Sequence, residues 1–316
     1  EQSYLNANFS AAAVRNLIAR GVFSTRIENV LRTPYKSIVK KDNAVVLTDE
    51  QTAAADAVMS SARPTLLFGV TGSGKTEVYL HCIEQALRDG KTAIMLVPEI
   101  SLTPQVMRIF RSRFGDDVAL LHSGLSDGER FDEWRRLLTG RARVAVGARS
   151  AIFAQLTDVG LIVIDEEHDS SYISESNPRY ITREVAFFRA QYNGAKVVMG
   201  SATPSMESYH AANCGEYTLA RLPNRVNKRS MPEIEIVNMC KEVTYGNFGV
   251  FSAKLVEALD DCIKAGNQAI LFLNRRGYSS YVMCKKCGYV AKCEDCDVSL
   301  VYHKEENVLK CHYCQR

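Results

Sequence analysis

The chain has 316 residues, of which 46% are apolar and 24% are charged, a composition typical of globular domains with a buried core. Its net charge of +3 is too small to indicate a class of partner. No apolar run approaches the roughly 20 residues that span a bilayer, and residues 1–8 lack the features of a signal peptide, so we expect a cytoplasmic protein with no membrane contact. The chain begins without methionine and ends two residues after a cysteine pair, which predicts that both ends are cuts through a longer protein.

Residues 1–42 are expected to form a small helical piece. Ser10 can cap a helix over Ala11–Ala19, and Gly21 can end it. Residues 1–41 hold seven basic side chains against Glu1 and Glu28, an excess of five. This excess suits contact with nucleic-acid phosphates, although a solvated helix face would carry the same charge. The basic residues are Arg15, Arg20, Arg26, Arg32, Lys36, Lys40 and Lys41.

From Leu47 onward, short apolar segments alternate with helical ones, including Lys75–Arg88 and Pro104–Phe114. This alternation predicts an α/β fold with a parallel sheet and helices on both faces. The predicted strands are Thr65–Val70, Thr92–Val97, Val118–Leu121, Val144–Gly147, Leu161–Ile164 and Lys196–Met199.

Residues 221–250 interrupt the alternation with two prolines, two glycines and a basic cluster, which predicts a linker. A new unit then begins with a helix over Ser252–Ala265 and a strand over Gln268–Leu273.

A phosphate-binding loop is predicted between the first strand and the helix that follows it. Glycines let backbone N–H groups turn inward around a β-phosphate, and the helix N-terminus adds positive potential. Lys75 can reach the β- and γ-phosphates of ATP, and the Thr76 hydroxyl can ligate Mg²⁺. The residues that fit G-x-x-x-x-G-K-[ST] are Gly69, Val70, Thr71, Gly72, Ser73, Gly74, Lys75 and Thr76.

An acidic motif follows the apolar strand Leu161–Ile164, at the carboxyl edge where such sheets bind ligands. Asp165 is expected to hold Mg²⁺, and Glu166 to position or deprotonate the attacking water. His168 either senses the nucleotide or is a structural histidine with a hydrogen bond. Upstream, Gln51 carries the paired donor and acceptor that could read the edge of adenine.

Three further segments lie in strand-to-helix turns behind the phosphate loop. Ser201 and Thr203, within GSATP, supply hydroxyls that can link the acidic motif to the rest of the cleft. Thr103 and Gln105, within VPEISLTPQ, suit a grip on a backbone phosphate, as do Arg149 and Ser150 within VGARS. Each segment alone could be an ordinary turn.

The ordered set Gln51, GVTGSGKT, VPEISLTPQ, GARSAIF, DEEHD and GSATP resembles superfamily 2 helicases. The wording GVTGSGKTEVY, HSGLSDGER, IDEEHDSSY and FLNRRGY, followed by paired cysteines, resembles the PriA family of replication-restart DNA helicases (primosomal protein N′). The resemblance covers most of residues 45–314. It implies a RecA-like ATP-binding lobe over 43–220, a linker and the start of a second such lobe over 221–283, and a zinc-binding module over 284–316. Residues 1–42 then correspond to part of a winged-helix DNA-binding domain.

The resemblance also implies a function. The family is a 3′-to-5′ DNA translocase that recognises stalled forks, binds branched and single-stranded DNA, and starts replication again by primosome assembly. The implied partners are primosome and helicase-loading proteins and single-stranded DNA-binding protein, in the bacterial cytoplasm at the nucleoid. The family has an aromatic-rich loop after the acidic motif, where Tyr172 and Tyr180 are expected to stack on bases, while Phe187 and Phe188 are expected to pack inside a helix.

Six of the ten cysteines form three Cys-x-x-Cys pairs, whereas Cys82, Cys214, Cys240 and Cys262 are isolated. In a cytoplasmic protein, paired cysteines predict Zn²⁺ ligation rather than disulfides. The spacing of Cys293, Cys296, Cys311 and Cys314 predicts one complete structural site. Cys284 and Cys287 are left without partners, and the resemblance implies a further pair beyond Arg316. His303 and His312 could substitute as ligands.

Two alternatives stay open. The chain could be a P-loop ATPase that acts on something other than nucleic acid, or a binding platform with a silent nucleotide site. The second lobe of such motors supplies arginines across the cleft, and Arg275 and Arg276 lie too early in that lobe to be assigned this role. We therefore expect residues 1–316 alone to bind nucleotide weakly and to unwind nothing.

Overall fold

The computed structural model describes residues 10–24, 45–98, 104–228, 230, 232–244, 247, 249–272, 282, 284, 287, 289–303, 308–311 and 313–314. By its internal contacts the chain divides into two units, residues 1–230 and residues 231–316. No described helix is both long and apolar enough to cross a membrane.

The first unit is built on a seven-stranded sheet in which each neighbouring pair of strands is parallel. The strand order is β3-β4-β2-β5-β8-β1-β9. All six predicted strands are present, and the seventh, β9, was not predicted. The strands are β1 (Thr65–Gly69), β2 (Thr92–Leu96), β3 (Val118–Leu121), β4 (Val144–Gly147), β5 (Val159–Asp165), β8 (Lys196–Ser201) and β9 (Thr218–Leu222).

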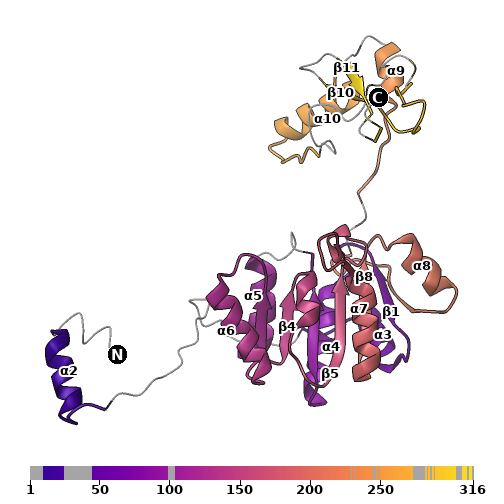
Figure 1. The fold of residues 1–316 in the computed structure, drawn as a ribbon. Helices are drawn as coiled ribbons and strands as arrows, with labels where there is room; N and C mark the ends of the chain where they lie inside the picture. The colour runs from indigo at the N-terminus through magenta and orange to yellow at the C-terminus, as the bar shows by residue number, and fades with distance from the viewer. Residues whose placement is uncertain are drawn as a thin grey trace. The chain divides into compact units, whose positions relative to one another are not determined.

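Helices cover both faces of this sheet (Figure 1). Successive strand residues point to opposite faces, so Leu67 and Met95 join one buried cluster while Leu66 and Ile94 join the other. The first cluster contains side chains of α3 (Asp49–Ser60), α4 (Lys75–Arg88) and α5 (Pro104–Phe114). The second contains side chains of α6 (Asp127–Leu138), α7 (Thr182–Asn193) and α8 (Met206–Asn213). The predicted layered α/β fold is therefore confirmed.

Local capping fixes where several helices begin. Thr48 and Gln51 form a reciprocal capping box at α3, and Ser126 and Glu129 form another at α6. Ser205 caps α8 by accepting from the backbone N–H of Ser208. Each of these caps satisfies backbone N–H groups in the first turn of its helix.

Short elements follow the acidic motif and the fourth strand. Three 3₁₀ helices cover Gly115–Asp117 (η2), Arg149–Phe153 (η3) and Ser170–Tyr172 (η4). The last leads directly into an antiparallel hairpin of β6 (Ile173–Ser174) and β7 (Tyr180–Ile181). The segment expected to be an aromatic-rich loop is thus a two-stranded hairpin that runs into α7.

Near the N-terminus, α2 (Ala11–Ala19) begins at Ser10, whose side chain accepts from the Ala13 backbone, and Gly21 follows it at φ +72°. This is the predicted helix with the predicted ends. The other residues assigned to a winged-helix piece lie largely outside the described residues.

The second unit contains α9 (Met239–Thr244), α10 (Ala253–Lys264) and an antiparallel pair of β10 (Val301–His303) and β11 (Val308–Lys310). The helix predicted over Ser252–Ala265 is confirmed, with Ser252 as its cap. The strand predicted over Gln268–Leu273 is wrong for the described residues 268–272, which form no ladder. Ile270 is 96% exposed, and no described strand lies beside this apolar segment to bury it.

Candidate nucleotide and nucleic-acid site

The phosphate loop lies where β1 ends and α4 begins. Gly72 and Gly74 have φ values of +81° and +82°, which only glycine adopts at little cost. Lys75 is the first residue of α4, and its Nζ donates to the carbonyl oxygen of Gly69 at 2.8 Å. The lysine is therefore folded back over the loop, at the place where a bound anion would lie.

Gln51 lies beneath this loop with only 4% of its surface exposed. Its Oε1 accepts from the backbone N–H of Thr48 at 3.0 Å, and its Nε2 donates to the carbonyl of Ser73 at 3.0 Å. A Cβ at Gly74 would overlap the same amide, so glycine is required there for a second reason. Gln51 thus joins α3 to the phosphate loop through one acceptor and one donor site of its amide, and its adenine-reading role stays a prediction.

Asp165 ends β5 and meets the phosphate-loop helix through Tyr79. The Tyr79 hydroxyl donates to Asp165 Oδ1 at 3.0 Å, and burial raises the pKa of Tyr79, so the hydroxyl keeps its proton. Gly200 on β8 is paired with Asp165, and a Cβ at Gly200 would overlap the Tyr79 hydroxyl. Sequence reasoning did not identify Tyr79. It lies four residues after Lys75, one turn along the same helix face, and that spacing could have found it.

Lys75 and Asp165 are close enough for the lysine charge to affect the pKa of Asp165. Burial, followed by the neighbouring charge of Glu166, raises the pKa of Asp165, while the Tyr79 hydrogen bond and the Lys75 charge lower it. The net direction is upward, so the fold holds this carboxylate in an environment that disfavours its charge. The lysine-tipped loop and the acidic motif therefore meet at one edge of the sheet.

Replacing Asp165 by asparagine is expected to stabilise the nucleotide-free protein. A carboxyl whose pKa is higher in the folded state than in the unfolded state destabilises folding as the pH rises above its ordinary value near 3.8. Asparagine keeps an oxygen that can accept from Tyr79. We expect the melting temperature at pH 7, without nucleotide or Mg²⁺, to rise by about 2–4 °C, the shift that about 1 kcal/mol produces in a unit of this size.

Scanning calorimetry at pH 7 and pH 4 checks this expectation, because the gain should shrink at the lower pH. Asp116→Asn, at a side chain that is 98% exposed, is the matched control. A variant Asp165→Asn that melts below the parent at pH 7 would contradict it.

His168 and the two hydroxyls of GSATP form one cluster. His168 Nδ1 lies 2.8 Å from Ser201 Oγ and 3.6 Å from Glu166 Oε2, and its Nε2 lies 3.5 Å from Thr203 Oγ1. The Ser201 hydroxyl also accepts from the backbone N–H of Thr203 at 2.9 Å. The structure thus brings together His168, Ser201 and Thr203, three of the five residues that the sequence singled out for coupling. Glu166 stands beside them in the left-handed region, at φ 46°.

Glu167, which sequence reasoning left aside, is the anchor of α8. Its side chain is 1% exposed and accepts from the Ser205 backbone N–H at 2.7 Å and from the Ser208 hydroxyl at 2.9 Å. Arg183 on α7 adds a charge at 3.8 Å. The three acids in a row therefore have distinct surroundings: Asp165 faces the phosphate-loop helix, Glu166 faces His168, and Glu167 faces the interior.

Tyr172 was expected to stack on bases, and this prediction is wrong for the structure. The residue is 4% exposed, and its hydroxyl donates to the backbone oxygen of Asp165 at 2.7 Å. Phe188, expected to be internal, is 74% exposed, whereas Phe187 packs edge to face on Tyr217 as expected. The hydroxyl partner explains the difference for Tyr172, because it turns the ring inward under the acidic motif.

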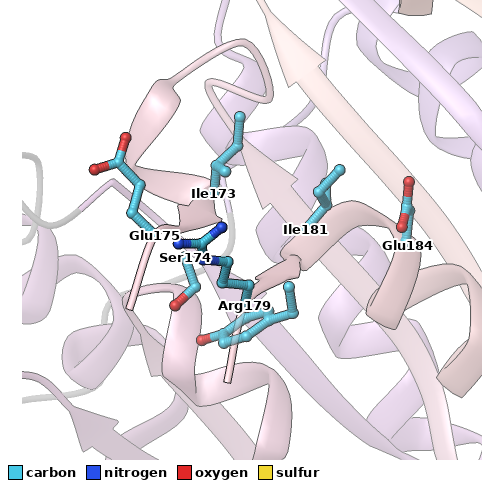
Figure 2. Close-up of a pocket in the computed structure, with 7 residues that line it drawn as sticks. Ile173, Ser174, Glu175, Arg179, Ile181 and Glu184 are labelled. Carbon is cyan, nitrogen blue, oxygen red and sulfur yellow. The ribbon is translucent and has the colours of Figure 1, made fainter. Parts of the chain in front are cut away.

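Tyr180 keeps a surface position on the hairpin. Its ring packs edge to face on Phe153, with ring centres 5.1 Å apart. A pocket of about 720 Å³ opens beside it, and Figure 2 shows Glu175 and Glu184 at its two ends with Arg179 between them. These side chains belong to the segment directly after the acidic motif.

Arg149 ties the fourth strand to this hairpin. Its Nη1 donates to the carbonyl oxygens of Ser171 at 3.3 Å and Ile173 at 2.9 Å. Ser150, next in η3, is exposed. Of the other residues expected to hold a DNA backbone, Gln105 is exposed on α5, and Thr103 lies outside the described residues.

A groove of about 900 Å³ opens between η3, the hairpin and α6. Arg149, Ser150 and Tyr180 line it, and so do aromatic residues that sequence reasoning missed. Phe131 and Trp134 stack with ring centres 6.4 Å apart and are 58% and 36% exposed. The signal for them was present, since two aromatic residues three apart on a polar helix share one face. The further charged or ionisable residues that line the groove are His122, Asp127 and Arg130.

In the second unit, the sulfur atoms of Cys293, Cys296, Cys311 and Cys314 all lie within 4.8 Å of one another. The sulfurs of Cys293 and Cys314 are 3.6 Å apart, close to the roughly 3.8 Å that tetrahedral Zn–S bonds of about 2.3 Å require. The Cys314 backbone N–H lowers the pKa of Cys311 to about 7, while a hydrogen bond with the Cys314 side chain raises the pKa of Cys296 to about 12, because the clustered thiols share their protons. The four thiols therefore fit zinc. Within the described part of the chain, Cys284, Cys287 and His303 lie outside this group.

Family comparison agrees with this geometry. The model of the DEAD/DEAH box helicase family matches residues 48–212, more than half of the chain. The chain belongs to the DEAD/DEAH box helicase family. A second helicase-derived model, the PriA DNA helicase Cys-rich region domain, matches residues 293–316 and so contains all four clustered cysteines.

Within this helicase family, the chain is similar in sequence to replication restart proteins. The chain is 51% identical over 311 residues to the replication restart protein PriA of Bacillus subtilis, with 96% of the chain and 39% of that protein covered. It is 38% identical over 317 residues to the PriA of Haemophilus influenzae, with 98% of the chain and 43% of that protein covered. The resemblance to PriA is thus confirmed. The chain spans about two fifths of the length of these relatives.

Among solved structures, RecG bound to a three-way DNA junction matches with a TM-score of 0.43 and 22% identity, over 72% of this chain and 34% of that one.

Proposed function

We propose that the chain carries the ATP-binding lobe and the zinc module of an ATP-driven 3′-to-5′ DNA helicase that restarts replication at stalled forks. One observation carries the proposal: the Lys75 loop and Asp165 meet at the carboxyl edge of a parallel sheet, joined through Tyr79. The replication restart proteins to which the chain is similar support the choice of DNA and of replication restart.

The residues at the sheet edge divide the work of ATP hydrolysis. The loop Gly69–Thr76 would cradle the β- and γ-phosphates, with Lys75 exchanging its bond to Gly69 for a phosphate oxygen. Thr76 and Asp165 would hold Mg²⁺, which neutralises charge on the transferred phosphoryl group. Glu166 would position the attacking water and accept its proton.

Coupling to the second lobe would pass through the histidine cluster. His168 contacts Glu166, Ser201 and Thr203 within 3.6 Å. A change at the γ-phosphate that moves Glu166 therefore changes the hydrogen bonds of GSATP, which leads into α8. This arrangement favours the nucleotide-sensing role of His168 over a purely structural one.

The groove beside η3 would hold single-stranded DNA. Arg149 and Ser150 line it as predicted backbone contacts, and Phe131 and Trp134 offer stacked aromatic faces to unpaired bases. Its hairpin wall leads back to Asp165 through Tyr172 and Arg149. DNA in the groove would thus touch the β6–β7 hairpin, which follows Asp165 and Glu166 in the chain. This contact would couple DNA binding to hydrolysis, the role expected of an aromatic-rich loop.

Trp134→Ala is expected to weaken binding of an oligo-dT strand by about fivefold or more, since stacking contributes about 1–3 kcal/mol per base. Fluorescence anisotropy measures the affinity, and Trp134→Phe should restore most of it. The control is Tyr192→Ala, at an aromatic residue on α7 that is 85% exposed and does not line the groove. Equal affinities of Trp134→Ala and Tyr192→Ala for oligo-dT would show that DNA does not bind in this groove.

The remaining assignments follow from the relatives. Branched DNA, primosome and helicase-loading proteins and single-stranded DNA-binding protein are the partners proposed, at the bacterial nucleoid. The proposed domains are a partial winged helix over 1–42, lobe 1 over 43–220, the linker and start of lobe 2 over 221–283, and the zinc module from 284. β9 extends two residues into the segment proposed as linker, because Leu222 is buried against the core.

ATP turnover with and without single-stranded DNA tests the function. A chain that spans the full length of its relatives should hydrolyse ATP faster when DNA is present. An equal rate of ATP turnover with and without DNA would favour an ATPase that acts on another substrate. No turnover in either condition would favour a binding platform with a silent nucleotide site. Residues 1–316 alone should bind nucleotide weakly and separate no strands.

A further inference from the structure

The last residue of β9 and the six residues after it, 222–228, form a strap over the phosphate loop. The Val226 backbone N–H donates to the carbonyl of Gly72 at 3.0 Å, and the Val70 N–H donates to the carbonyl of Leu222 at 3.1 Å. Both bonds join the strap to the loop itself.

The strap is also tied to α3. Asn224 Nδ2 donates to Glu50 Oε1 at 2.7 Å, and the Val226 side chain comes within 3.3 Å of the position that a Cβ on Gly74 would occupy. Gln51 contacts that same position from the other element. The strap therefore borders the nucleotide site together with α3.

Arg225 is the cation of this strap, and it lies against the middle of the loop. Its Cγ is 3.9 Å from the position of a Cβ on Gly72. Its Nε is buried and has no hydrogen-bond partner among the described residues. Ser73, in the loop, is 2% exposed, and its hydroxyl likewise has no described partner. Buried polar groups without partners are rare in folded proteins, so both atoms point to an acceptor that a ligand would supply.

We infer that Arg225 is a further nucleotide-binding residue, which contacts the phosphate chain of the bound nucleotide from the strap. The inference rests on the proposed nucleotide site. A guanidinium is a fork of donors that matches phosphate oxygens, and a phosphate gives the Nε proton its acceptor. Because the strap is hydrogen-bonded to Gly72, a phosphate bound in the loop would lie next to the Arg225 side chain.

Binding of a fluorescent N-methylanthraniloyl-ADP to residues 1–316, with Mg²⁺, measures the contribution of Arg225. Arg225→Ala should weaken binding by about tenfold to a hundredfold, the range for a charged hydrogen bond. Inorganic tripolyphosphate should lose its ability to compete by the same factor. The affinity of Arg225→Lys for the labelled ADP should lie between those of the parent and Arg225→Ala. Arg221→Ala, which changes an exposed arginine on β9, should bind the labelled ADP as tightly as the parent does.

Melting temperatures without nucleotide show that each variant is folded. Unchanged affinity in Arg225→Ala, while Lys75→Ala loses binding, would overturn the inference and leave the proposed site intact. A loss for ADP but not for tripolyphosphate would place Arg225 on the base instead of the phosphates and would overturn it too. Absence of ADP binding by the parent would overturn both the site and the inference.

Discussion

Lys75→Ala is expected to lower DNA-stimulated ATP turnover by about 100- to 1000-fold, the effect of removing one donor aimed at developing charge in a transition state. The side chain has one partner in the nucleotide-free loop, the Gly69 carbonyl at 2.8 Å. It can exchange that neutral acceptor for a phosphate oxygen with little movement. Its positive charge also lowers the pKa of Asp165, so the variant loses this stabilisation of the carboxylate as well.

Steady-state turnover at saturating single-stranded DNA, in a chain of the relatives' full length, measures this effect. Lys91→Ala is the matched control, because Lys91 is exposed just before β2, at the opposite edge of the sheet from the phosphate loop. Turnover of Lys75→Ala within tenfold of the parent would show that hydrolysis occurs elsewhere. DNA affinity should be the same in all three proteins.

Cys296→Ala is expected to release zinc and to unfold the cysteine module. Structural zinc contributes apparent free energies of about 10–16 kcal/mol to small modules of this kind. The described elements around the site are only the short pair β10 and β11, and such a pair is not stable in water alone. Buried Cys293 and Cys311 would be left without the ion that holds them together.

Native mass spectrometry should count one fewer zinc ion in Cys296→Ala than in the parent, and limited proteolysis should cut it within residues 284–316. Cys262→Ala, a change of the same type on α10 and outside the cluster, should keep the parent's zinc content. Strong chelators should reproduce the effect of Cys296→Ala without altering the melting of the first unit. Equal zinc counts in the two variants would contradict the four-thiolate assignment.

The sequence predicted the sheet and the phosphate loop well because both depend on local patterns. Apolar runs of four to six residues mark buried parallel strands, and the loop needs glycines and Lys75 at fixed spacing. The four-cysteine cluster was predicted for the same reason: two tight turns at the right separation define a tetrahedral site.

What the sequence left out depends on partners distant in the chain. Tyr172 is buried because its hydroxyl finds the backbone of Asp165, and no local pattern distinguishes it from an exposed tyrosine. The last two residues of β9 were assigned to the linker because Arg221 and Pro223 flank its last buried residue, Leu222. The segment after α10 has strand-like composition but no described neighbour to pair with, so composition alone misled.

The groove was missed for a related reason. Its walls come from α6, η3 and the β6–β7 hairpin, which are up to about fifty residues apart in the chain and adjoin only in the folded lobe. Sequence reasoning singled out Tyr180 but not Trp134, and it gave no reason to place the two side by side. Only the fold places them on one cavity.

The buried carboxylate of Glu167 has a mechanical consequence. It clamps Ser205 and Ser208 at the start of α8, while the hydroxyl of Ser201, four residues earlier, is held by His168. The turn from β8 into α8 is thus pinned at both ends by one stretch of chain, the acidic motif. A displacement of the acidic motif is therefore expected to move this turn and the start of α8 together.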